Sequence, residues 1–246
     1  MMIHDKLDNR VVFVTGGSRG IGKAIVEKFQ SHDWRAATCS TTEEGVRGSG
    51  ADWGMVCDVS DPAQVRAVIN ALISRFGRLD AVINNAGLAG SESLGPDEDI
   101  ENWHRVISVN LNGTYYVCQS ALAHLPDMTG RIVNIASVLG LKGVPQAGAY
   151  CAAKHGVVGL TRALSHDLAP RHITVNAICP GWVRTDMAVN RMRDIGLKES
   201  SLAQSVPLGR FIEPHEVADL AYFLIASEAG AGMTGQALVL DGGVLA

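Results

Sequence analysis

The chain lacks the features that mark extracellular, membrane-spanning and nucleic-acid-binding proteins. Its 246 residues hold only five cysteines, none in a CxxC pair, and their spacing matches no zinc site. No apolar run approaches the ~18 residues that span a bilayer. The net charge is −4, without a basic block or an acidic tail. These absences argue against a disulfide scaffold, a membrane protein and a nucleic-acid partner.

The cellular compartment is predicted from the cysteines and from the first ten residues. Most cysteines lie in apolar runs such as residues 54–57, which is typical of buried, reduced thiols. Residues 1–10 carry His, Asp and Lys and have no apolar stretch, unlike a secretory signal. We therefore expect a cytoplasmic protein in a reducing compartment.

Short apolar runs alternate with helical patterns along the chain. The strand candidates are Val11–Val14, Ala36–Ser40, Met55–Cys57, Ala81–Asn84, Arg131–Ala136, Thr174–Ile178 and Ala237–Leu240. The helix candidates are Ile21–Gln30, Pro62–Phe76, Ile100–Leu122, Tyr150–Leu168 and Pro214–Ala226. This alternation indicates βαβ units with right-handed crossovers. We predict one α/β domain over residues 1–246, a Rossmann-type doubly wound parallel sheet of about seven strands flanked by helices.

A glycine-rich turn follows the first predicted strand and opens the first predicted helix. It reads TGGSRGIG from Thr15 to Gly22. Glycines let the backbone approach a pyrophosphate, and a helix N-terminus offers free N–H groups and positive potential. In this position the turn indicates a dinucleotide site, although a purely structural turn would show the same pattern.

The end of the second predicted strand bears on which dinucleotide binds. Sites for NAD often have an acidic residue there, which holds the ribose 2′-hydroxyl. Here the strand continues into Thr41, and no carboxylate occurs before Glu43. Arg19 in the glycine turn suits a 2′-phosphate. We expect NADP(H) to be preferred, with NAD(H) possible because Glu43 and Glu44 follow closely. Asp58, after the third strand, is expected either to contact the adenine amino group or to cap the next helix.

Tyr150 and Lys154 are four residues apart in a helical pattern, which puts both on one helix face. A tyrosine has a reference pKa of ~10, and a neighbouring ammonium lowers it, so that the pair can shuttle protons. The spacing alone is common by chance. However, Ser137 ends a predicted strand, and Asn110 lies in a helical stretch that asparagine does not favour. Polar residues thus gather at one edge of the sheet.

As a set, these motifs closely resemble the short-chain dehydrogenase/reductase family. The matching elements, which cover Arg10 to Gly243, are the TGxxxGxG turn, NNAG at 84–87, Asn110, Ser137, the YxxxK pair, PG at 180–181 and DGG at 241–243. The resemblance implies that Tyr150 is the general acid or base and that Lys154 holds the nicotinamide ribose and lowers the Tyr150 pKa. It also implies that Ser137 hydrogen-bonds the substrate oxygen and that Asn110 holds a relay water. No metal is required.

The resemblance and the motifs together give a set of expected cofactor contacts. They are Gly16, Ser18, Arg19, Gly20, Ile21, Gly22, Thr41, Asp58, Val59, Asn85, Ala86, Gly87, Tyr150, Lys154, Pro180, Gly181, Val183 and Thr185. A dinucleotide-sensing regulator of the same fold would be expected to have lost part of the catalytic set, which is complete here.

The substrate is predicted less sharply than the reaction. The chain looks most like the 3-oxoacyl-(acyl-carrier-protein) reductases, on the glycine turn, Thr41 and residues 154–161 and 209–218. We expect a ketone–alcohol oxidoreductase acting on an acyl thioester, either free or carried by acyl carrier protein. The alternative is another small ketone or secondary alcohol, such as a polyketide, 3-hydroxy acid, sugar, polyol or cyclic alcohol. Basic residues that a carrier protein would need at the entrance are Arg131, Lys142, Arg184, Arg191 and Arg193.

Two segments bear on the entrance to the site and on assembly. Residues 182–206 have weak periodicity and are predicted to form a substrate lid over the carboxyl edge of the sheet. Trp182 is expected either to line the pocket or to pack under this lid. The helical stretches at 100–122 and 150–168 carry apolar residues on more than one face, which is typical of helices buried on both sides. Since the family commonly buries them between subunits, we predict a homotetramer.

Overall fold

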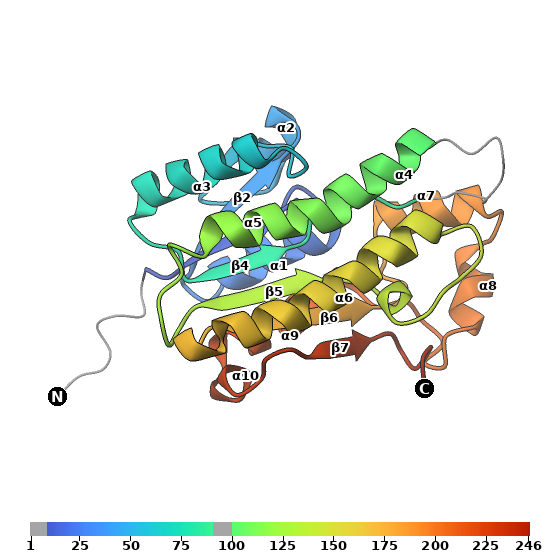
Figure 1. Cartoon of the computed structure of the whole chain (residues 1–246). Helices are drawn as coiled ribbons and strands as arrows, with labels where there is room; N and C mark the ends of the chain where they lie inside the picture. The colour runs from blue at the N-terminus through green and yellow to red at the C-terminus, as the bar shows by residue number, and fades with distance from the viewer. Residues whose placement is uncertain (1–8, 91–99) are drawn as a thin grey trace.

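The computed structural model describes residues 9–90 and 100–246, and its centre is a seven-stranded sheet (Figure 1). All neighbouring strands are parallel, in the order β3-β2-β1-β4-β5-β6-β7. The strands are β1 (Val11–Thr15), β2 (Arg35–Ser40), β3 (Trp53–Val56), β4 (Ala81–Asn84), β5 (Arg131–Ile135), β6 (Thr174–Pro180) and β7 (Ala237–Leu240). The predicted doubly wound parallel sheet is confirmed, and each strand lies close to its predicted bounds.

Helices connect the strands and cover the sheet. The helices are α1 (Gly20–Gln30), α2 (Glu43–Gly48), α3 (Pro62–Phe76), α4 (Ile100–Ile107), α5 (Gly113–Ala121), α6 (Gly148–Leu168), α7 (Asp186–Asp194), α8 (Glu199–Gln204), α9 (Pro214–Ala226) and α10 (Glu228–Ala231). Because the chain moves outward from β1 to β3 and then returns to build β4 to β7, the direction of winding changes between β1 and β4. In open α/β sheets, ligands bind at this switch point.

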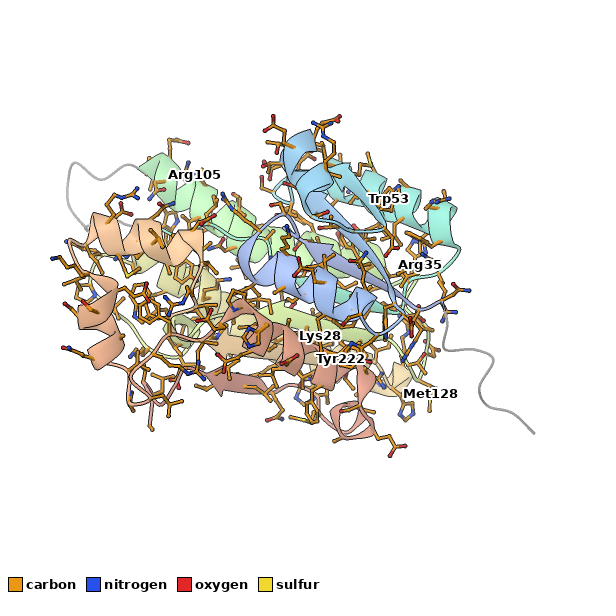
Figure 2. The ribbon with its side chains drawn as sticks, turned by 180° about the vertical axis from the view of Figure 1, so that it is seen from behind. Lys28, Arg35, Trp53, Arg105, Met128 and Tyr222 are labelled. Carbon is orange, nitrogen blue, oxygen red and sulfur yellow. The ribbon has the colours of Figure 1, made fainter. Side chains whose placement is uncertain are left out.

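The two faces of the sheet bury separate apolar cores. One core packs α3, α5 and α6 against one face, which is turned toward the viewer in Figure 1. The other packs α1 and α9 against the opposite face, where Figure 2 shows Lys28 of α1 beside Tyr222 of α9. All five residues of β1 are buried, as expected for a central parallel strand covered on both sides.

Local capping explains why α3 begins and ends where the sequence predicts. The Asp61 carboxylate accepts hydrogen bonds from the N–H groups of Ala63 and Gln64, and Pro62 occupies the first helical position. Gly77, with a φ of 72°, ends the helix in the left-handed conformation that glycine adopts at no steric cost. Asp61 therefore takes the capping role, which leaves Asp58 available to the site.

The helical stretch predicted at residues 100–122 is interrupted. A π-helical turn, Ser108–Asn112, separates α4 from α5. The side-chain amide of Asn110 accepts a hydrogen bond from the Leu88 N–H (2.7 Å) and donates one to the Leu88 carbonyl (2.9 Å). This contact joins residues far apart in the sequence, so helical periodicity could not have predicted it. Single π turns of this kind are frequent at functional sites.

The cysteines agree with the prediction of buried thiols. All five are free, and four of them are buried, whereas Cys151 is partly exposed. Within the described residues, no helix is long and apolar enough to cross a bilayer. The expectation that residues 1–10 are not a secretory signal falls mostly on residues 1–8, which lie outside the described part of the chain.

Candidate active site

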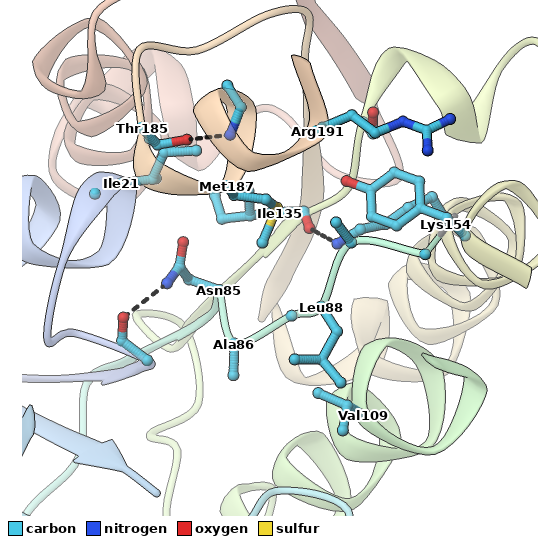
Figure 3. Close-up of a pocket in the computed structure, with 18 of the residues that line it drawn as sticks. Ile21, Asn85, Ala86, Leu88, Val109, Ile135, Lys154, Thr185, Met187 and Arg191 are labelled. Atoms are coloured by element: carbon cyan, nitrogen blue, oxygen red, sulfur yellow. Dashed lines mark hydrogen bonds between the residues drawn. The ribbon is translucent and has the colours of Figure 1, made fainter. Parts of the chain in front are cut away.

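A cavity of about 910 Å³ lies at the carboxyl ends of the strands, around the switch point between β1 and β4 (Figure 3). Its volume is typical of sites for small molecules and cofactors, which are roughly 300–1,000 Å³. The predicted site residues that line it are Gly16, Ser18, Arg19, Gly20, Ile21, Thr41, Asp58, Val59, Asn85, Ala86, Gly87, Ser137, Tyr150, Lys154, Pro180, Gly181, Val183 and Thr185. Residues chosen from seven separate parts of the sequence thus meet in one cavity.

The glycine turn is held by hydrogen bonds from two neighbouring strands. The Thr38 hydroxyl of β2 donates to the Val14 carbonyl (2.7 Å) and accepts from the Gly17 N–H (3.0 Å). From the end of β4, the Asn85 amide donates to the carbonyls of Thr15 (3.0 Å) and Gly16 (3.1 Å). These contacts fix the turn against the sheet before any ligand is bound.

The N-terminus of α1 opens into the cavity. Its first residues, Gly20 and Ile21, line the cavity, and Arg19 precedes them. Among the described residues, no side chain caps this helix end. The first N–H groups of the helix therefore remain available to an anion, and the helix dipole adds positive potential. The pyrophosphate of a dinucleotide fits this arrangement.

The end of β2 has the charge pattern that the sequence suggested. Ser40 and Thr41 line the cavity, whereas Glu43 and Glu44 are not part of its lining. Glu43 instead forms an ion pair with Arg47 inside α2 (3.3 Å). Across the cavity, one carboxylate oxygen of Asp58 accepts hydrogen bonds from the N–H (2.9 Å) and hydroxyl (2.7 Å) of Ser60. Asp58 is thus held in place at the cavity wall.

Ser137, Tyr150 and Lys154 form the polar centre of the cavity. The Ser137 hydroxyl hydrogen-bonds the Tyr150 side chain, and the Lys154 ammonium lies 5.7 Å from the centre of the Tyr150 ring. The Lys154 ammonium donates to the Ile135 carbonyl at the end of β5 (2.8 Å), as Figure 3 shows. A positioned phenol, a second hydroxyl and a cation are the groups needed to protonate a developing alkoxide.

Burial dominates the acid–base properties of this centre. It raises the pKa of Tyr150 above its ordinary value of 10.0, and the hydrogen bond from Ser137 opposes that rise. Burial also lowers the pKa of Lys154 from 10.5 to about 8. Burial thus sets the direction of the Tyr150 pKa shift in this structure, and the expected lowering of that pKa by Lys154 stays a prediction.

Comparison with known proteins identifies the family. The family model described as "Enoyl-(Acyl carrier protein) reductase" matches residues 16–245. The "Granaticin polyketide synthase putative ketoacyl reductase 1" of Streptomyces violaceoruber is 42% identical, over 95% of this chain and 92% of that protein. The chain belongs to the short-chain dehydrogenase/reductase family. It is an oxidoreductase of that family, as the motifs predicted.

Other short-chain dehydrogenases/reductases that resemble the chain act on different molecules. The D-threitol dehydrogenase of Mycolicibacterium smegmatis is 36% identical, over 97% of this chain and 94% of that protein. A crystal structure of a variant of actinorhodin polyketide ketoreductase with NADPH matches with a TM-score of 0.89 and 36% identity, over 96% and 97% of the two chains. The family framework is thus shared by enzymes named for a ketoacyl group and for a polyol.

Two of the predicted site residues lie behind the cavity wall of this short-chain dehydrogenase/reductase. Gly22 packs against the glycine turn, where an added Cβ atom would lie 2.2 Å from the Gly16 carbonyl oxygen. Asn110 holds Leu88, and Leu88 lines the cavity. Both polar atoms of the Asn110 amide are used in this contact. The role expected for Asn110, holding a relay water, therefore stays a prediction.

The predicted lid supplies one wall of the cavity. Residues 182–206 fold into α7 and α8, and the segment contributes Trp182, Val183, Thr185, Asp186, Met187, Ala188, Arg191 and Ile195 to the lining. Trp182 also stacks on Phe211, with ring centres 5.7 Å apart. Trp182 therefore lines the cavity and also packs against an apolar cluster that includes Met192 of α7.

Two of the basic residues that were predicted at the entrance line the cavity, and a third cation that was not predicted joins them. Lys142 and Arg191 line it, and Figure 3 shows Arg191 on the same side as Lys154. Arg105 of α4 also lines it, and no sequence pattern had singled this residue out. Of the other predicted basic residues, Arg131 is buried against main-chain carbonyls and Arg184 is paired with two glutamates.

Proposed function

We propose that this short-chain dehydrogenase/reductase uses NADPH to reduce the ketone of a 3-oxoacyl thioester to a secondary alcohol. One observation carries the proposal. The hydrogen-bonded hydroxyls of Ser137 and Tyr150, with Lys154 beside them, share a cavity with the uncapped N-terminus of α1. A proton donor and an anion-binding helix end in one cavity suit a nicotinamide dinucleotide and a carbonyl substrate.

The residues present fit NADPH along the length of the cavity. The first N–H groups of α1 suit the pyrophosphate, and Arg19 with Thr41 suits the 2′-phosphate. A carboxylate at the end of β2 would oppose that phosphate, but neither Glu43 nor Glu44 lines the cavity. At the nicotinamide end we assign Lys154 to the ribose hydroxyls, together with the lining residues Pro180, Gly181, Val183 and Thr185.

The chemistry of the chain itself is proton transfer and positioning. When bound, NADPH supplies the hydride that reduces the carbonyl carbon. Tyr150 then gives its proton to the carbonyl oxygen, and Ser137 hydrogen-bonds the same oxygen and keeps it within reach. Because burial raises the pKa of Tyr150, the phenol keeps its proton at neutral pH and acts as an acid. The Lys154 ammonium provides the positive charge that favours proton release.

The lining of the cavity supports an acyl thioester as the substrate. Arg105, Lys142 and Arg191 bring positive charge to this lining, which also includes the apolar side chains of Leu139 and Met187. An acyl chain suits the apolar wall, and the phosphates of a coenzyme A or carrier-protein arm suit the cations. A polyol is the second candidate, since one relative is named as a D-threitol dehydrogenase.

Steady-state kinetics of the purified protein would test the proposal. We expect NADPH oxidation with acetoacetyl thioesters of coenzyme A and of acyl carrier protein. Because Arg19 gains a charged hydrogen bond to the 2′-phosphate, kcat/KM with NADPH should exceed that with NADH by about tenfold or more. D-threitol with either oxidised cofactor tests the second candidate, and a crotonyl thioester tests the enoyl reduction named by the family description.

These measurements test the cofactor assignment and the substrate class independently of each other. A higher kcat/KM with NADH would overturn the assignment of Arg19 and Thr41. No turnover of either acetoacetyl thioester, together with activity on the polyol or the crotonyl thioester, would overturn the substrate class while leaving the catalytic centre unchallenged.

A further inference from the structure

The DGG motif at residues 241–243 directly follows β7 at the carboxyl edge of the sheet. Leu240 of β7 pairs with Pro180 of β6, so that Asp241 lies beside Gly181. An added Cβ atom on Gly181 would lie only 2.9 Å from the Asp241 Cβ atom. The DGG motif is thus in contact with the PG motif, which lines the cavity at the end assigned to the nicotinamide.

The Asp241 carboxylate folds the residues that follow it into a tight turn. Asp241 is buried, and its two oxygen atoms accept separate hydrogen bonds from the Gly243 N–H (2.8 Å) and the Leu245 N–H (2.8 Å). Gly242 and Gly243 have φ values of 68° and 97°, which glycine adopts at little steric cost. Because both hydrogen bonds end on one buried carboxylate, the position of Asp241 fixes the path of residues 242–245.

This turn packs closely against the chain that follows α8. The Leu208 N–H donates to the Gly242 carbonyl (3.0 Å). An added Cβ atom on Gly242 would lie 2.7 Å from the Val206 side chain, so the contact leaves no room for one. In Figure 1 the chain after β7 runs toward the side of the molecule that holds α7 and α8. The turn is therefore held by its own carboxylate and by the end of the predicted lid.

The turn brings Val244 between the cavity and the apolar side chains of the lid. Val244 lines the cavity, and it also packs against a cluster formed by Met192, Val206 and Phe211. Trp182, which lines the cavity as well, packs against the same cluster. Val244 is outside the set of expected cofactor contacts. An apolar side chain in this position suits an apolar part of the substrate.

Two of the three cations in the lining come from another part of the sheet edge. Arg105 belongs to α4, which follows β4 in the chain, and Lys142 follows β5, whereas Val244 follows β7. In the strand order, β6 separates β5 from β7. A substrate that places the phosphates of its thioester arm at these two cations leaves its acyl chain free to extend toward Val244.

We propose that Val244 determines the length of acyl chain that the cavity accepts, and that Asp241 is the positioning residue that holds Val244 in the wall. The inference rests on the proposed function, since it concerns the substrate of the same site. A smaller side chain at position 244 lengthens the apolar space, and a larger one shortens it. Loss of one of the two hydrogen bonds to Asp241 releases the turn, so that Val244 no longer closes the wall.

Kinetics with two thioesters of different chain length test the role of Val244. The measured quantity is the kcat/KM for 3-oxohexanoyl coenzyme A divided by that for acetoacetyl coenzyme A. One methylene group in an apolar pocket changes specificity roughly tenfold or more, so Val244→Ala should raise this ratio by about tenfold and Val244→Leu should lower it by a similar factor. Val189→Ala makes the same change at an exposed position of α7 that does not line the cavity, and it should leave the ratio unchanged.

A double-mutant cycle tests whether Asp241 acts through Val244. Asparagine keeps the size of Asp241 and its contact with Gly181, but an NH₂ group replaces one acceptor oxygen. Asp241→Asn should raise the ratio, as Val244→Ala does, and leave the Kd for NADPH nearly unchanged. In the Val244→Ala protein, Asp241→Asn should have little further effect on the ratio, because the side chain that it positions is already truncated.

Three results would overturn the inference. They are an unchanged ratio in Val244→Ala, an equal effect of Asp241→Asn with and without the truncation of Val244, and a changed Kd for NADPH at an unchanged ratio. The same proteins are also assayed with 2-hexanone and 2-butanone, which carry no thioester. A parent protein that reduces these ketones but neither thioester would contradict the proposed substrate, and the ratio for the two ketones would still test Val244.

Discussion

At the scale of single residues, Lys154 is a charged group that the fold buries in the candidate site. Its side chain is 5% exposed, and its ammonium has one hydrogen bond to a main-chain carbonyl among the described contacts. Burial lowers its pKa from 10.5 to about 8 because a buried ammonium loses its hydration. In the proposed function this group serves catalysis at the expense of stability, as active-site groups often do.

Replacing Lys154 with methionine should stabilise the protein below about pH 8. Between about 8 and 10.5 the unfolded chain binds a proton that the folded chain does not, so the penalty is full below about pH 8 and gone above 10.5. The pKa shift corresponds to a penalty of about 3 kcal/mol, and the loss of the Lys154 hydrogen bond offsets about 1 kcal/mol of the stability gained by its removal. Urea unfolding at pH 7 and pH 10 measures this gain in the free energy of unfolding. A gain that does not shrink with rising pH, or one shared by the exposed Lys198→Met, would contradict this account.

Removal of the Tyr150 hydroxyl should abolish most of the activity and leave the cofactor in place. Tyr150→Phe removes the proton donor, for which a loss in kcat of roughly 10²–10⁴-fold is expected. The Kd for NADPH should change little, since the assigned cofactor contacts remain. Tyr115→Phe, at an exposed position on α5, is the matched control and should retain full kcat. Equal kcat values for the two variants would mean that Tyr150 does not take part in the reaction.

At the scale of elements, the contact between the glycine turn and α1 leaves no room for a side chain. An alanine at Gly22 would place its Cβ 2.2 Å from the Gly16 carbonyl oxygen and 2.5 Å from the Asn85 amide nitrogen. Gly22→Ala should therefore displace the turn, raise the Kd for NADPH, and cost about 1–3 kcal/mol of stability. Gly48→Ala, where the Cβ meets nothing within 4 Å, should bind normally. Normal NADPH binding by both variants would mean that the glycine turn shifts to make room for the added methyl group without losing the cofactor.

The predicted lid is tied to the rest of the domain by Arg184. Its guanidinium pairs with Glu199 of α8 and with Glu213 before α9 (2.8 Å for the latter). Arg184→Gln should loosen α8 and change the KM for the ketone more than the KM for NADPH, because the segment lines the mouth. Arg193→Gln, whose described contact is with Asn190 alone, is the control. A larger change in the KM for NADPH than in the KM for the ketone would instead assign the segment a role in cofactor binding.

Elements whose ends are set locally could be predicted from the sequence. Asp61, Pro62 and Gly77 fix the ends of α3, so its bounds were predicted correctly. The π turn at Ser108–Asn112 could not be predicted from helical periodicity, and Asn110 within it contacts Leu88 from another part of the fold. Gly22 and Asn110, which were predicted as site residues, do not line the cavity, and their predicted roles stay predictions. The pKa of Tyr150 needed the structure because burial sets it.

At the scale of the whole molecule, the structure bears on the predicted homotetramer. Val157 and Val158 of α6, a helix predicted to be buried between subunits, already pack in an apolar cluster of this chain. The outer edge of β7 remains unpaired in the described part of the chain, and Val239 on it is 44% exposed. Open edges and apolar strands are commonly covered by another subunit. The homotetramer therefore stays a prediction, now resting on a different surface.

Light scattering at micromolar concentration tests the assembly. We expect four times the chain mass for the parent protein, and a smaller assembly for Val239→Lys because the charge would be buried against the second copy. Met128→Lys, at another exposed apolar position, should remain tetrameric. A monomeric parent protein would exclude the assembly altogether.

The order of the strands also determines when the protein can begin to work during its own synthesis. Strand β1 is made early, yet its neighbour β4 follows much later, and Asn85 reaches back 70 residues to Thr15. Val244, near the end of the chain, also lines the cavity. At ~5–20 residues per second, the ribosome needs roughly ten seconds or more to reach it from β1. Until β4 has emerged, the nascent chain carries an open edge on its central strand, and this is the period in which a chaperone would matter most.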